Sequence, residues 1–331
     1  MSLRIGRPKV KRGESFDLVI VGGGPAGLSA AIYASRFLLK TVVLTVDVGG
    51  QLNLTNWVED YPGLGRIQAS ELVEKFRKHA ESFGVNVVWG VEVKGVERVG
   101  DSTFKVTGTG GVEVYANTVL LAVGARRRKL GVPGEEELVG KGVSYCSVCD
   151  APLFKGSKAV AVVGGGDSAL EGASLLSSYV GRVYLIHRRD SFRAKPFLVA
   201  DVKSRGNVEF LLNSVVTEII GGEAVRAVKV LNKATGEEKV LDVEGVFIEI
   251  GFEPSIEFFK SIGLETDDYG YVKVDEWMRT NIPGVFAAGD AISTWRGFRQ
   301  IVTAAATGAV AAYSAYQYLI EKGLYRSPDR T

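Results

Sequence analysis

The chain has 331 residues, of which 46% are hydrophobic, so it is long enough for two domains of ordinary size that each bury a core. Its 40 basic and 38 acidic residues leave a formal charge of +2, which gives no indication of binding to nucleic acid or to an anionic membrane. No apolar run is long enough to span a bilayer, and the basic N-terminus lacks the apolar core of a signal peptide, so we expect a soluble cytoplasmic protein.

The first structured segment has the pattern of a dinucleotide-binding unit. An apolar run of strand length, residues 16–21, leads into Gly22-Gly23-Gly24-Pro25-Ala26-Gly27 and then into a helix-like stretch over 28–37. A second apolar run, 41–44, precedes Asp47. Glycines let the backbone approach a pyrophosphate at the helix N-terminus, and an acid in this place can bond a ribose hydroxyl. The sequence therefore predicts a strand–helix–strand unit that binds a first dinucleotide.

Two segments of different character follow this unit. Residues 49–63 are polar and rich in glycine, and we expect them to pack on a ligand without forming a helix. Residues 70–83 have apolar residues at three- and four-residue spacing, which predicts an amphipathic helix. We interpret His79, on the apolar face, as a half-buried packing residue and not as a catalyst. Strand-like runs at 85–99, 103–107 and 112–122 complete this part of the chain.

The chain contains two cysteines, Cys146 and Cys149, and Asp150 follows directly. Two thiols at this spacing can form an easily reduced disulfide, and the spacing commonly lowers the pKa of one of them. Asp150 is close enough to handle the proton that thiol exchange moves. These residues predict a redox-active centre without a metal. Two other interpretations remain: half of a zinc site, with His79 and His187 as distant ligands, or a structural disulfide closing a very short loop.

The strand–helix–strand pattern then repeats. Residues 158–163 predict a strand, Gly164-Gly165-Gly166-Asp167-Ser168-Ala169 a second phosphate loop, 170–178 a helix and 183–186 the next strand. Arginines stand where the first unit has its acid, which favours a 2′-phosphate over a free 2′-hydroxyl. We therefore predict that this unit binds NADPH, unless the cluster is a solvated basic turn. The predicted NADPH residues are Gly164, Gly166, Asp167, Ser168, His187, Arg188, Arg189 and Arg193.

The C-terminal third supplies features suited to a flavin. Strands are predicted at 208–220, 224–232, 240–249 and 271–274. Residues 284–290 read as a strand ending in Gly289-Asp290, whose carboxylate can bond a sugar-alcohol hydroxyl. A helix predicted over 301–320 would point its positive N-terminal end at a reduced flavin. Because NADPH delivers a hydride and a thiol pair exchanges two electrons, a flavin is the natural carrier between them.

With these motifs, the chain closely resembles the low-molecular-weight thioredoxin reductases, flavoproteins with two dinucleotide folds, over about residues 16–319. The shared motifs are the GGGPAG loop, Gly49-Gly50-Gln51-Leu52, Cys146-x-x-Cys149-Asp150, the second phosphate loop, HRRDSFRA at 187–194, and Gly289-Asp290 with Arg299-Gln300. The cysteine pair lies inside the NADPH-binding segment, whereas in glutathione-reductase-like relatives it follows the first phosphate loop.

The resemblance implies an α/β fold of two Rossmann-like domains. An NADPH domain, 124–251, carries the cysteine pair and is inserted into a discontinuous FAD domain, 1–123 and 252–331. It also implies a homodimer and a rotation of the domains, in which the disulfide and NADPH reach the flavin by turns. The implied FAD residues are Gly22, Gly24, Pro25, Ala26, Gly27, Asp47, Gly50, Gln51, Leu52, Asp60, Val93, Gly289, Asp290, Arg299, Gln300 and Ile301.

The resemblance also assigns roles at the redox centre. Cys149 would face the flavin, Cys146 would attack the disulfide of a partner protein, and Asp150 would move the proton. Residues 151–154, Ala-Pro-Leu-Phe, stand where relatives carry a glycine and two aromatics that help bind thioredoxin, so a glutaredoxin-like or two-domain thiol protein is as plausible a partner as thioredoxin. Two other functions remain open: an NAD(P)H oxidase or ferredoxin-linked flavin reductase, which needs no cysteines, and a redox sensor that works without steady turnover.

Overall fold

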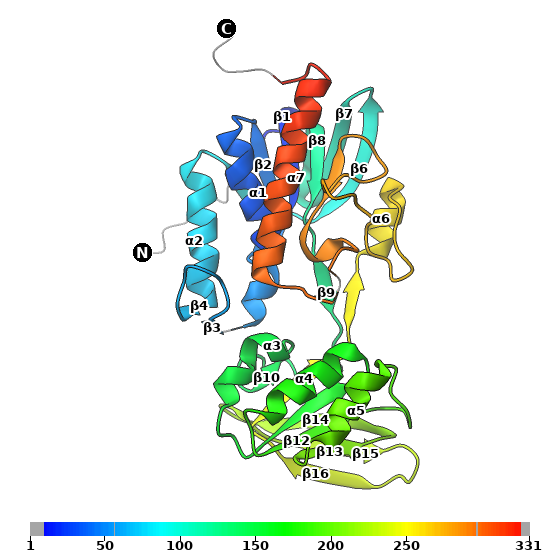
Figure 1. The fold of residues 1–331 in the computed structure, drawn as a ribbon. Helices are drawn as coiled ribbons and strands as arrows, with labels where there is room; N and C mark the ends of the chain where they lie inside the picture. The colour runs from blue at the N-terminus through cyan, green and yellow to red at the C-terminus, as the bar shows by residue number, and fades with distance from the viewer. Residues whose placement is uncertain (1–9, 56, 296, 326–331) are drawn as a thin grey trace.

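The computed structural model describes residues 10–55, 57–295 and 297–325, and these residues form two α/β units (Figure 1). Both ends of the chain build the first unit, and the middle of the chain builds the second, which is inserted into it (Figure 1). The predicted fold class of two dinucleotide-binding domains, one inserted in the other, is confirmed.

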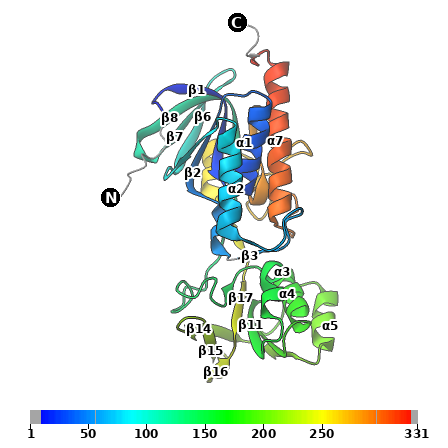
Figure 2. The same ribbon diagram turned by 90° about the vertical axis from the view of Figure 1, so that its left-hand side faces the viewer.

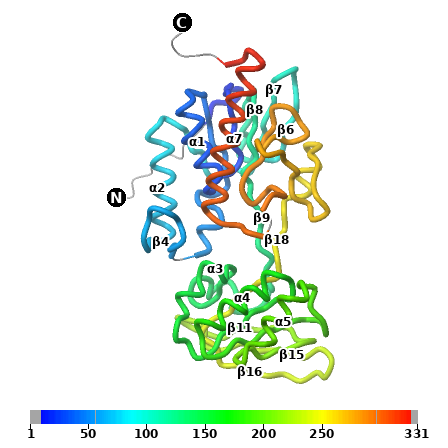
Figure 3. The backbone as a smooth tube through the Cα atoms, in the orientation of Figure 1, coloured from blue at the N-terminus to red at the C-terminus, as the bar shows by residue number. Residues whose placement is uncertain are grey.

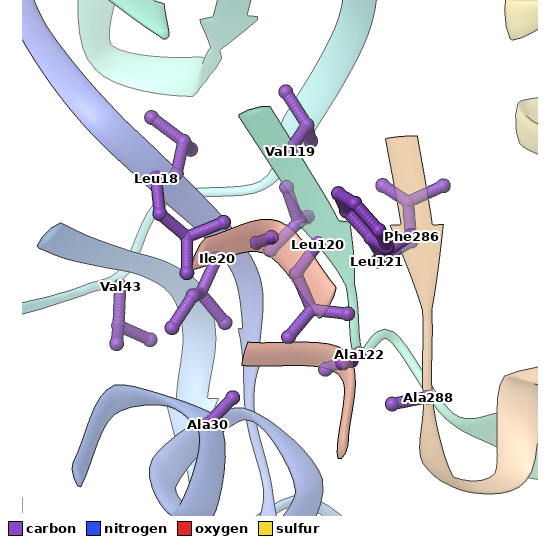
Figure 4. Close-up of a cluster of buried hydrophobic side chains, with 14 of the residues drawn as sticks. Leu18, Ile20, Ala30, Val43, Val119, Leu120, Leu121, Ala122, Phe286 and Ala288 are labelled. Carbon is purple, nitrogen blue, oxygen red and sulfur yellow. The ribbon is translucent and has the colours of Figure 1, made fainter. Parts of the chain in front are cut away.

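The first unit is built on a seven-stranded mixed sheet with the order β5-β2-β1-β8-β7-β6, and β19 also pairs with β8. Its strands are β1 (Glu14–Gly23), β2 (Thr41–Val48), β5 (Asn86–Trp89), β6 (Val93–Gly100), β7 (Thr103–Gly108), β8 (Val112–Leu121) and β19 (Val285–Ala287). The predicted run at 85–99 is two strands, because Gly90 turns the chain with a φ of 79°. Figure 4 shows the core where β1, β2, β8 and β19 meet α1.

Four helices and several short elements accompany this sheet. They are α1 (Pro25–Arg36), α2 (Ala69–Ser82), α6 (Ile256–Ile262) and α7 (Ile301–Glu321), with the short pieces η1 (Gly50–Leu54), β3 (Trp57–Val58), β4 (Ile67–Gln68), η2 (Thr109–Gly111) and η4 (Gly289–Ala291). Helices α1 and α7 lie side by side (Figures 1 and 2). A Cβ at Gly308 would lie 2.0 Å from the Ala26 carbonyl oxygen, so small residues are what allow the two backbones to touch. None of the helices in the described ranges is long and apolar enough to cross a membrane.

The second unit has a five-stranded parallel sheet between two different layers. Its strands, in sheet order, are β10 (Val143–Ser144), β17 (Gly245–Glu249), β11 (Ala159–Gly164), β12 (Arg182–Ile186) and β13 (Val208–Leu211). One face packs on α4 (Asp167–Ser177) and α5 (Pro196–Ser204), and the other on the antiparallel sheet of β14 (Ser214–Gly221), β15 (Val225–Asn232) and β16 (Glu238–Asp242). Alternation along β11 explains this, because Val160 and Val162 face the helices while Ala161 and Val163 face the second sheet.

The two units are joined by a narrow two-stranded ribbon. Strands β9 (Ala125–Arg127) and β18 (Phe252–Pro254) pair antiparallel, so the outgoing and returning segments run side by side (Figure 3). Gly124 and Gly251 lie just before the two strands, with φ values of 64° and 95° that favour glycine. The ribbon lies close to the predicted crossings, and the domain boundaries at 123/124 and 251/252 stay a prediction at the level of single residues.

Several local predictions were wrong. The predicted strands at 208–220 and 240–249 are each two strands, β13 and β14 and then β16 and β17, which belong to different sheets. His79 is exposed and its ring lies 5.5 Å from that of Phe83, because the buried stripe of α2 is narrower than the spacing suggested. Residues 271–274 do not form a strand, since Val272 makes only isolated bridges to Thr266 and Ile292 within the described residues. The segment 49–63 does contain a turn of 3₁₀ helix, η1. Propensity and period alone do not decide such short elements, which depend on tertiary contacts.

Candidate redox site and dinucleotide sites

Cys146 and Cys149 form a disulfide at the edge of the second unit, with their Cα atoms 5.3 Å apart. Cys146 is the extended residue before α3 (Ser147–Asp150), and its Sγ accepts a hydrogen bond from the Cys149 N–H at 3.2 Å. Both cysteines are half-buried. Helix α3 lies on the side of the second unit that faces the first (Figures 1 and 2). The disulfide uses both thiols, and no group of three or more potential metal ligands occurs among the residues described.

Asp150 is the last residue of α3, which we call the redox helix, and it bonds a residue of the first unit. Its Oδ2 accepts a hydrogen bond from Ser144 Oγ at 2.7 Å, and its Oδ1 accepts one from Thr55 Oγ1 at 3.2 Å. Thr55 belongs to the segment after η1, in the first unit. Burial raises the pKa of the Asp150 carboxyl group, while the two hydroxyl donors and Arg127 act in the opposite direction. A carboxyl group with a raised pKa releases and takes up protons closer to neutral pH than an ordinary aspartate does.

The first glycine-rich loop has the close contacts that only glycine allows. Gly22 has a φ of 114°, and a Cβ there would lie 2.2 Å from the Ala122 carbonyl oxygen. A Cβ at Gly27 would lie 1.9 Å from the Gly22 carbonyl oxygen. The loop therefore turns sharply from β1 into α1, which begins at Pro25. This is the strand, turn and helix that the sequence predicted for a dinucleotide phosphate.

Residues from the two ends of the chain meet beside this loop. Gln51 Nε2 donates to Asp290 Oδ2 at 2.6 Å, and a Cβ at Gly289 would lie 2.9 Å from that of Ala26. Gln300 caps α7, whose first residue is Ile301. The structure thus brings together most of the residues predicted to bind FAD: Gly22, Gly24, Pro25, Ala26, Gly27, Gly50, Gln51, Leu52, Gly289, Asp290, Arg299, Gln300 and Ile301.

Arg299 provides a test of whether these residues suit FAD. Its guanidinium carbon lies 4.6 Å from the ring centre of Phe252 and 4.2 Å from that of Tyr271. Its Nη1 donates to the Tyr271 hydroxyl at 3.2 Å, but its Nη2 is buried and has no hydrogen-bond partner among the described residues. Buried guanidinium N–H groups need an acceptor, and a flavin dinucleotide offers carbonyl and phosphate oxygens. The residues present therefore fit this cofactor.

Three predicted FAD residues lie at the margin of this group. Asp47 is exposed, and its Oδ1 accepts a hydrogen bond from the Gly50 N–H at 3.0 Å, so it shapes the turn into η1. Asp60 is exposed, and its charge contributes to the raised pKa of Asp150. Val93 begins β6, at the opposite edge of the sheet from β5. Of the three, Asp47 adjoins the first loop, because a Cβ at Gly23 would lie 3.0 Å from the Asp47 carbonyl oxygen.

The second glycine-rich loop lies against the arginine-bearing segment, as the sequence predicted. A Cβ at Gly165 would lie 2.1 Å from the His187 ring, and the Arg193 N–H donates to the Gly165 carbonyl oxygen at 2.9 Å. His187 is buried, and burial together with the neighbouring guanidinium groups lowers its pKa. The side chains of Arg188, Arg189 and Arg193 are exposed. Asp167 and Ser168 begin α4, so N–H groups and cations are available where a 2′-phosphorylated dinucleotide needs them.

Two residues near the redox helix were missed in the sequence. Arg127 on β9 donates its Nε–H to Gln51 Oε1 at 2.9 Å and lies 5.0 Å from the ring centre of Phe252. Burial lowers its pKa, while Glu249, Asp290 and Asp150 act in the opposite direction. The sequence analysis assigned no role to the four basic residues at 126–129, but strand alternation could have shown that the second of them points inward.

Glu249 is the other missed residue, and it accepts hydrogen bonds from Ser147, the first of the two residues between the cysteines. Its Oε1 accepts hydrogen bonds from the backbone N–H and the hydroxyl of Ser147, at 3.0 and 2.8 Å. A charged residue at the carboxyl end of an apolar parallel strand is the signal that could have found it, because ligands bind at that edge.

The chain matches a known protein family, curated relatives and solved structures. The sequence profile of the pyridine nucleotide-disulphide oxidoreductase family matches residues 16–308. A Listeria innocua protein named thioredoxin reductase is 43% identical over 308 residues, covering 92% of this chain and 94% of that protein. The thioredoxin reductase structure from Streptococcus pyogenes gives a TM-score of 0.85 at 38% identity, covering 93% of this chain and 99% of that one.

A second solved structure differs more in shape. It is that of Lactococcus lactis thioredoxin reductase, described as an FR conformation, with a TM-score of 0.64 at 39% identity. The match covers 92% of this chain and 99% of the Lactococcus lactis chain. Together these matches confirm the resemblance that the motifs indicated.

Proposed function

Because the chain belongs to the pyridine nucleotide-disulphide oxidoreductase family, we propose that it is a thioredoxin reductase, which passes electrons from NADPH to a protein disulfide. One observation carries this proposal: the Cys146–Cys149 disulfide lies on the helix that contacts the first unit, through the hydrogen bond from Thr55 to Asp150. An oxidase or a ferredoxin-linked reductase would need neither cysteine. The test is NADPH-dependent reduction of thioredoxin by the purified protein.

The two glycine-rich loops would hold two cofactors. The first loop, with Gln51, Asp290 and Arg299, would hold FAD, and the second loop, with the arginines after β12, would hold NADPH. Bound FAD supplies the chemistry that accepts a hydride from a nicotinamide and returns two electrons to a disulfide. The protein's part is to hold Arg299 and Asp290 at the flavin site and to present the disulfide to it.

The cysteine pair then transfers its two electrons by thiol exchange. Cys146, as a thiolate, attacks one sulfur of the partner disulfide and forms a mixed disulfide, and the other partner sulfur leaves as a thiolate. Cys149 then attacks Cys146, which releases the reduced partner and restores the disulfide. Asp150 takes up or supplies the proton that this exchange moves. The partner is thioredoxin or a protein with a glutaredoxin-like disulfide.

We propose that the second unit turns relative to the first during turnover. In the present arrangement Asp150 on α3 accepts a hydrogen bond from Thr55 of the first unit, whereas the hydrogen bonds of the second phosphate loop among the described residues stay within the second unit. NADPH on that loop therefore needs a different arrangement to reach the flavin site. Two thioredoxin reductase structures support such a motion, since they cover almost equal shares of this chain at almost equal identity but have TM-scores of 0.85 and 0.64.

Replacing the two adjacent arginines should change the cofactor preference. Arg188→Ala with Arg189→Ala removes two exposed guanidinium groups from the predicted 2′-phosphate site. We expect the ratio of kcat/KM for NADPH to that for NADH to fall about 10²-fold, since each charged hydrogen bond contributes about 1.5 kcal/mol. Steady-state kinetics with both dinucleotides measure this ratio. Arg182→Ala, at the other end of β12 and paired with Glu209 at 3.3 Å, is the matched control and should leave the ratio unchanged.

Asp150→Asn should slow the disulfide half of the reaction. A side chain that can no longer exchange a proton is expected to lower the rate of disulfide reduction about 10²-fold, with little effect on NADPH-dependent flavin reduction.

Asp60→Asn tests the same carboxyl group through the direction in which its pKa changes. Asp60 raises the pKa of Asp150, so its neutralisation should move the pH profile of disulfide reduction toward lower pH. A profile of Asp60→Asn that moves toward higher pH would contradict Asp150 as the titrating group.

Three further features belong to this proposal. The FAD domain would comprise residues 1–123 and 252–331, of which 1–9, 56, 296 and 326–331 lie outside the described residues, and the NADPH domain 124–251. The protein would act as a homodimer in the cytoplasm. Light scattering of the purified protein measures its mass in solution, and a mass of one chain would contradict the dimer.

A further inference from the structure

Glu249 lies between the redox helix and the second dinucleotide loop. It is the last residue of β17, which lies in the sheet between β10, the strand before Cys146, and β11, the strand that ends in Gly164. All three strands are parallel, so their carboxyl ends meet at one edge of the sheet. Glu249 is the direct register partner of Gly164. A charged side chain therefore stands where the two proposed sites adjoin.

The Glu249 carboxyl group holds the residue that follows the first cysteine. Its Oε1 accepts the Ser147 N–H at 3.0 Å and the Ser147 hydroxyl at 2.8 Å. Ser147 is buried, and a Cβ at Gly172 on α4 would lie 2.4 Å from its Oγ. The hydroxyl is thus enclosed between α4 and Glu249. Because Ser147 is bonded to Cys146 and begins α3, these two hydrogen bonds fix the start of the redox helix.

The charges around Glu249 come from three elements. Burial raises the pKa of Glu249, and Glu171 on α4 adds to this effect. The two hydrogen bonds from Ser147 on α3 and the charge of Arg127 on β9 act in the opposite direction and favour the ionised carboxylate. Arg127 also interacts with Asp150 and Asp290, so its charge is shared among three carboxyl groups. The ionised carboxylate of Glu249 thus has two hydrogen-bond donors from Ser147, and the cation that acts on it, Arg127, is shared with Asp150 and Asp290.

We propose that Glu249 is a positioning residue for the disulfide exchange: it fixes Ser147 at the start of the redox helix, and its negative charge disfavours the Cys146 thiolate. The inference rests on the proposed function, in which Cys146 is the attacking sulfur. A thiol with a higher pKa gives a more nucleophilic thiolate and a more strongly reducing couple. Glu249 would therefore favour electron flow toward the partner disulfide.

The test is the pH dependence of Cys146 alkylation in the full-length protein carrying Cys149→Ser, with iodoacetamide as the probe. Adding Glu249→Gln keeps an oxygen acceptor for Ser147 and removes the charge. We expect the midpoint of the alkylation rate to fall by about one pH unit, because a nearby like charge disfavours ionisation. The matched control is Glu244→Gln, at the opposite end of β17, whose carboxyl group bonds the Lys158 N–H at 2.8 Å. It should leave the midpoint unchanged.

Glu249→Asp distinguishes the effect of losing the negative charge from the effect of changing the side chain. It retains the negative charge, so its midpoint should stay within a few tenths of a pH unit of the protein with Glu249. An unchanged midpoint in Glu249→Gln, or an equal shift in Glu244→Gln, would overturn the inference. The measurement needs neither NADPH nor flavin. A wild-type protein that fails to reduce thioredoxin would therefore count against the proposed function alone, whereas an active wild type with no shift would count against Glu249 alone.

Discussion

Cys149→Ser is expected to abolish disulfide reduction, by about 10³-fold or more, while NADPH still reduces the bound flavin. The reason is that the disulfide on α3 is the acceptor in the proposed electron path, and one sulfur alone cannot carry two electrons to a partner. Loss of visible flavin absorbance under anaerobic conditions measures the first half of the reaction. Turnover with thioredoxin or DTNB measures the second.

Cys146→Ser is the matched variant, since it removes the other sulfur of the same disulfide. Both variants should be inactive toward thioredoxin, but they should differ in trapping. Cys149→Ser should accumulate a mixed disulfide through Cys146, whereas Cys146→Ser should not. The reverse result would exchange the proposed roles of the two sulfurs. Full disulfide reduction by Cys149→Ser would reject the electron path, and oxygen uptake that needs neither cysteine would favour an oxidase.

Gly27→Ala should destabilise the first unit by about 3 kcal/mol or more, at the upper end of what overpacking usually costs. Its Cβ would lie 1.9 Å from the Gly22 carbonyl oxygen, and neither backbone can move without disturbing the turn from β1 into α1. We also expect the purified variant to lose FAD, because the loop that approaches the pyrophosphate would open. Denaturant unfolding measures stability, and the ratio of flavin to protein absorbance measures cofactor retention.

Gly24→Ala provides the control in the same loop. The nearest atom to its Cβ would be the Gly49 carbonyl oxygen at 3.9 Å, and Gly24 has a φ of −80°, which any residue can adopt. Stability without cofactor should therefore stay within about 1 kcal/mol of wild type, while flavin affinity falls. Equal stability of Gly27→Ala and Gly24→Ala would show that the close contact at Gly27 does not hold the loop in its shape.

The features closest to the chemistry were readable in the sequence because local patterns determine them. A strand followed by glycines and a helix forms a phosphate loop wherever it folds, and both loops were found at their expected places. The cysteine pair is separated by two residues, so its closure into a disulfide depends on little beyond one turn of helix. The long helices and the central strands followed from apolar periodicity for the same reason.

The long-range contacts of the site could not be predicted in the same way. Thr55 meets Asp150 across 95 positions of sequence, and Ser147 meets Glu249 across 102, so no local pattern relates them. Their pairing depends on which strand ends share an edge of the sheet and on how the second unit sits on the first. The prediction that His79 is half-buried was wrong for a related reason, because the width of the buried stripe on α2 depends on what the helix packs against.

The ribbon of β9 and β18 limits how the second unit can move. Two chain segments join the units and pair with each other at three positions, so the units are connected by two strands that cannot pass through each other. Rotation of the second unit twists this pair of strands, and continued rotation in one direction would break the hydrogen bonds between β9 and β18. In the proposed rotation, each turn of the second unit is therefore reversed along the path by which it came, and the unit oscillates between two end positions.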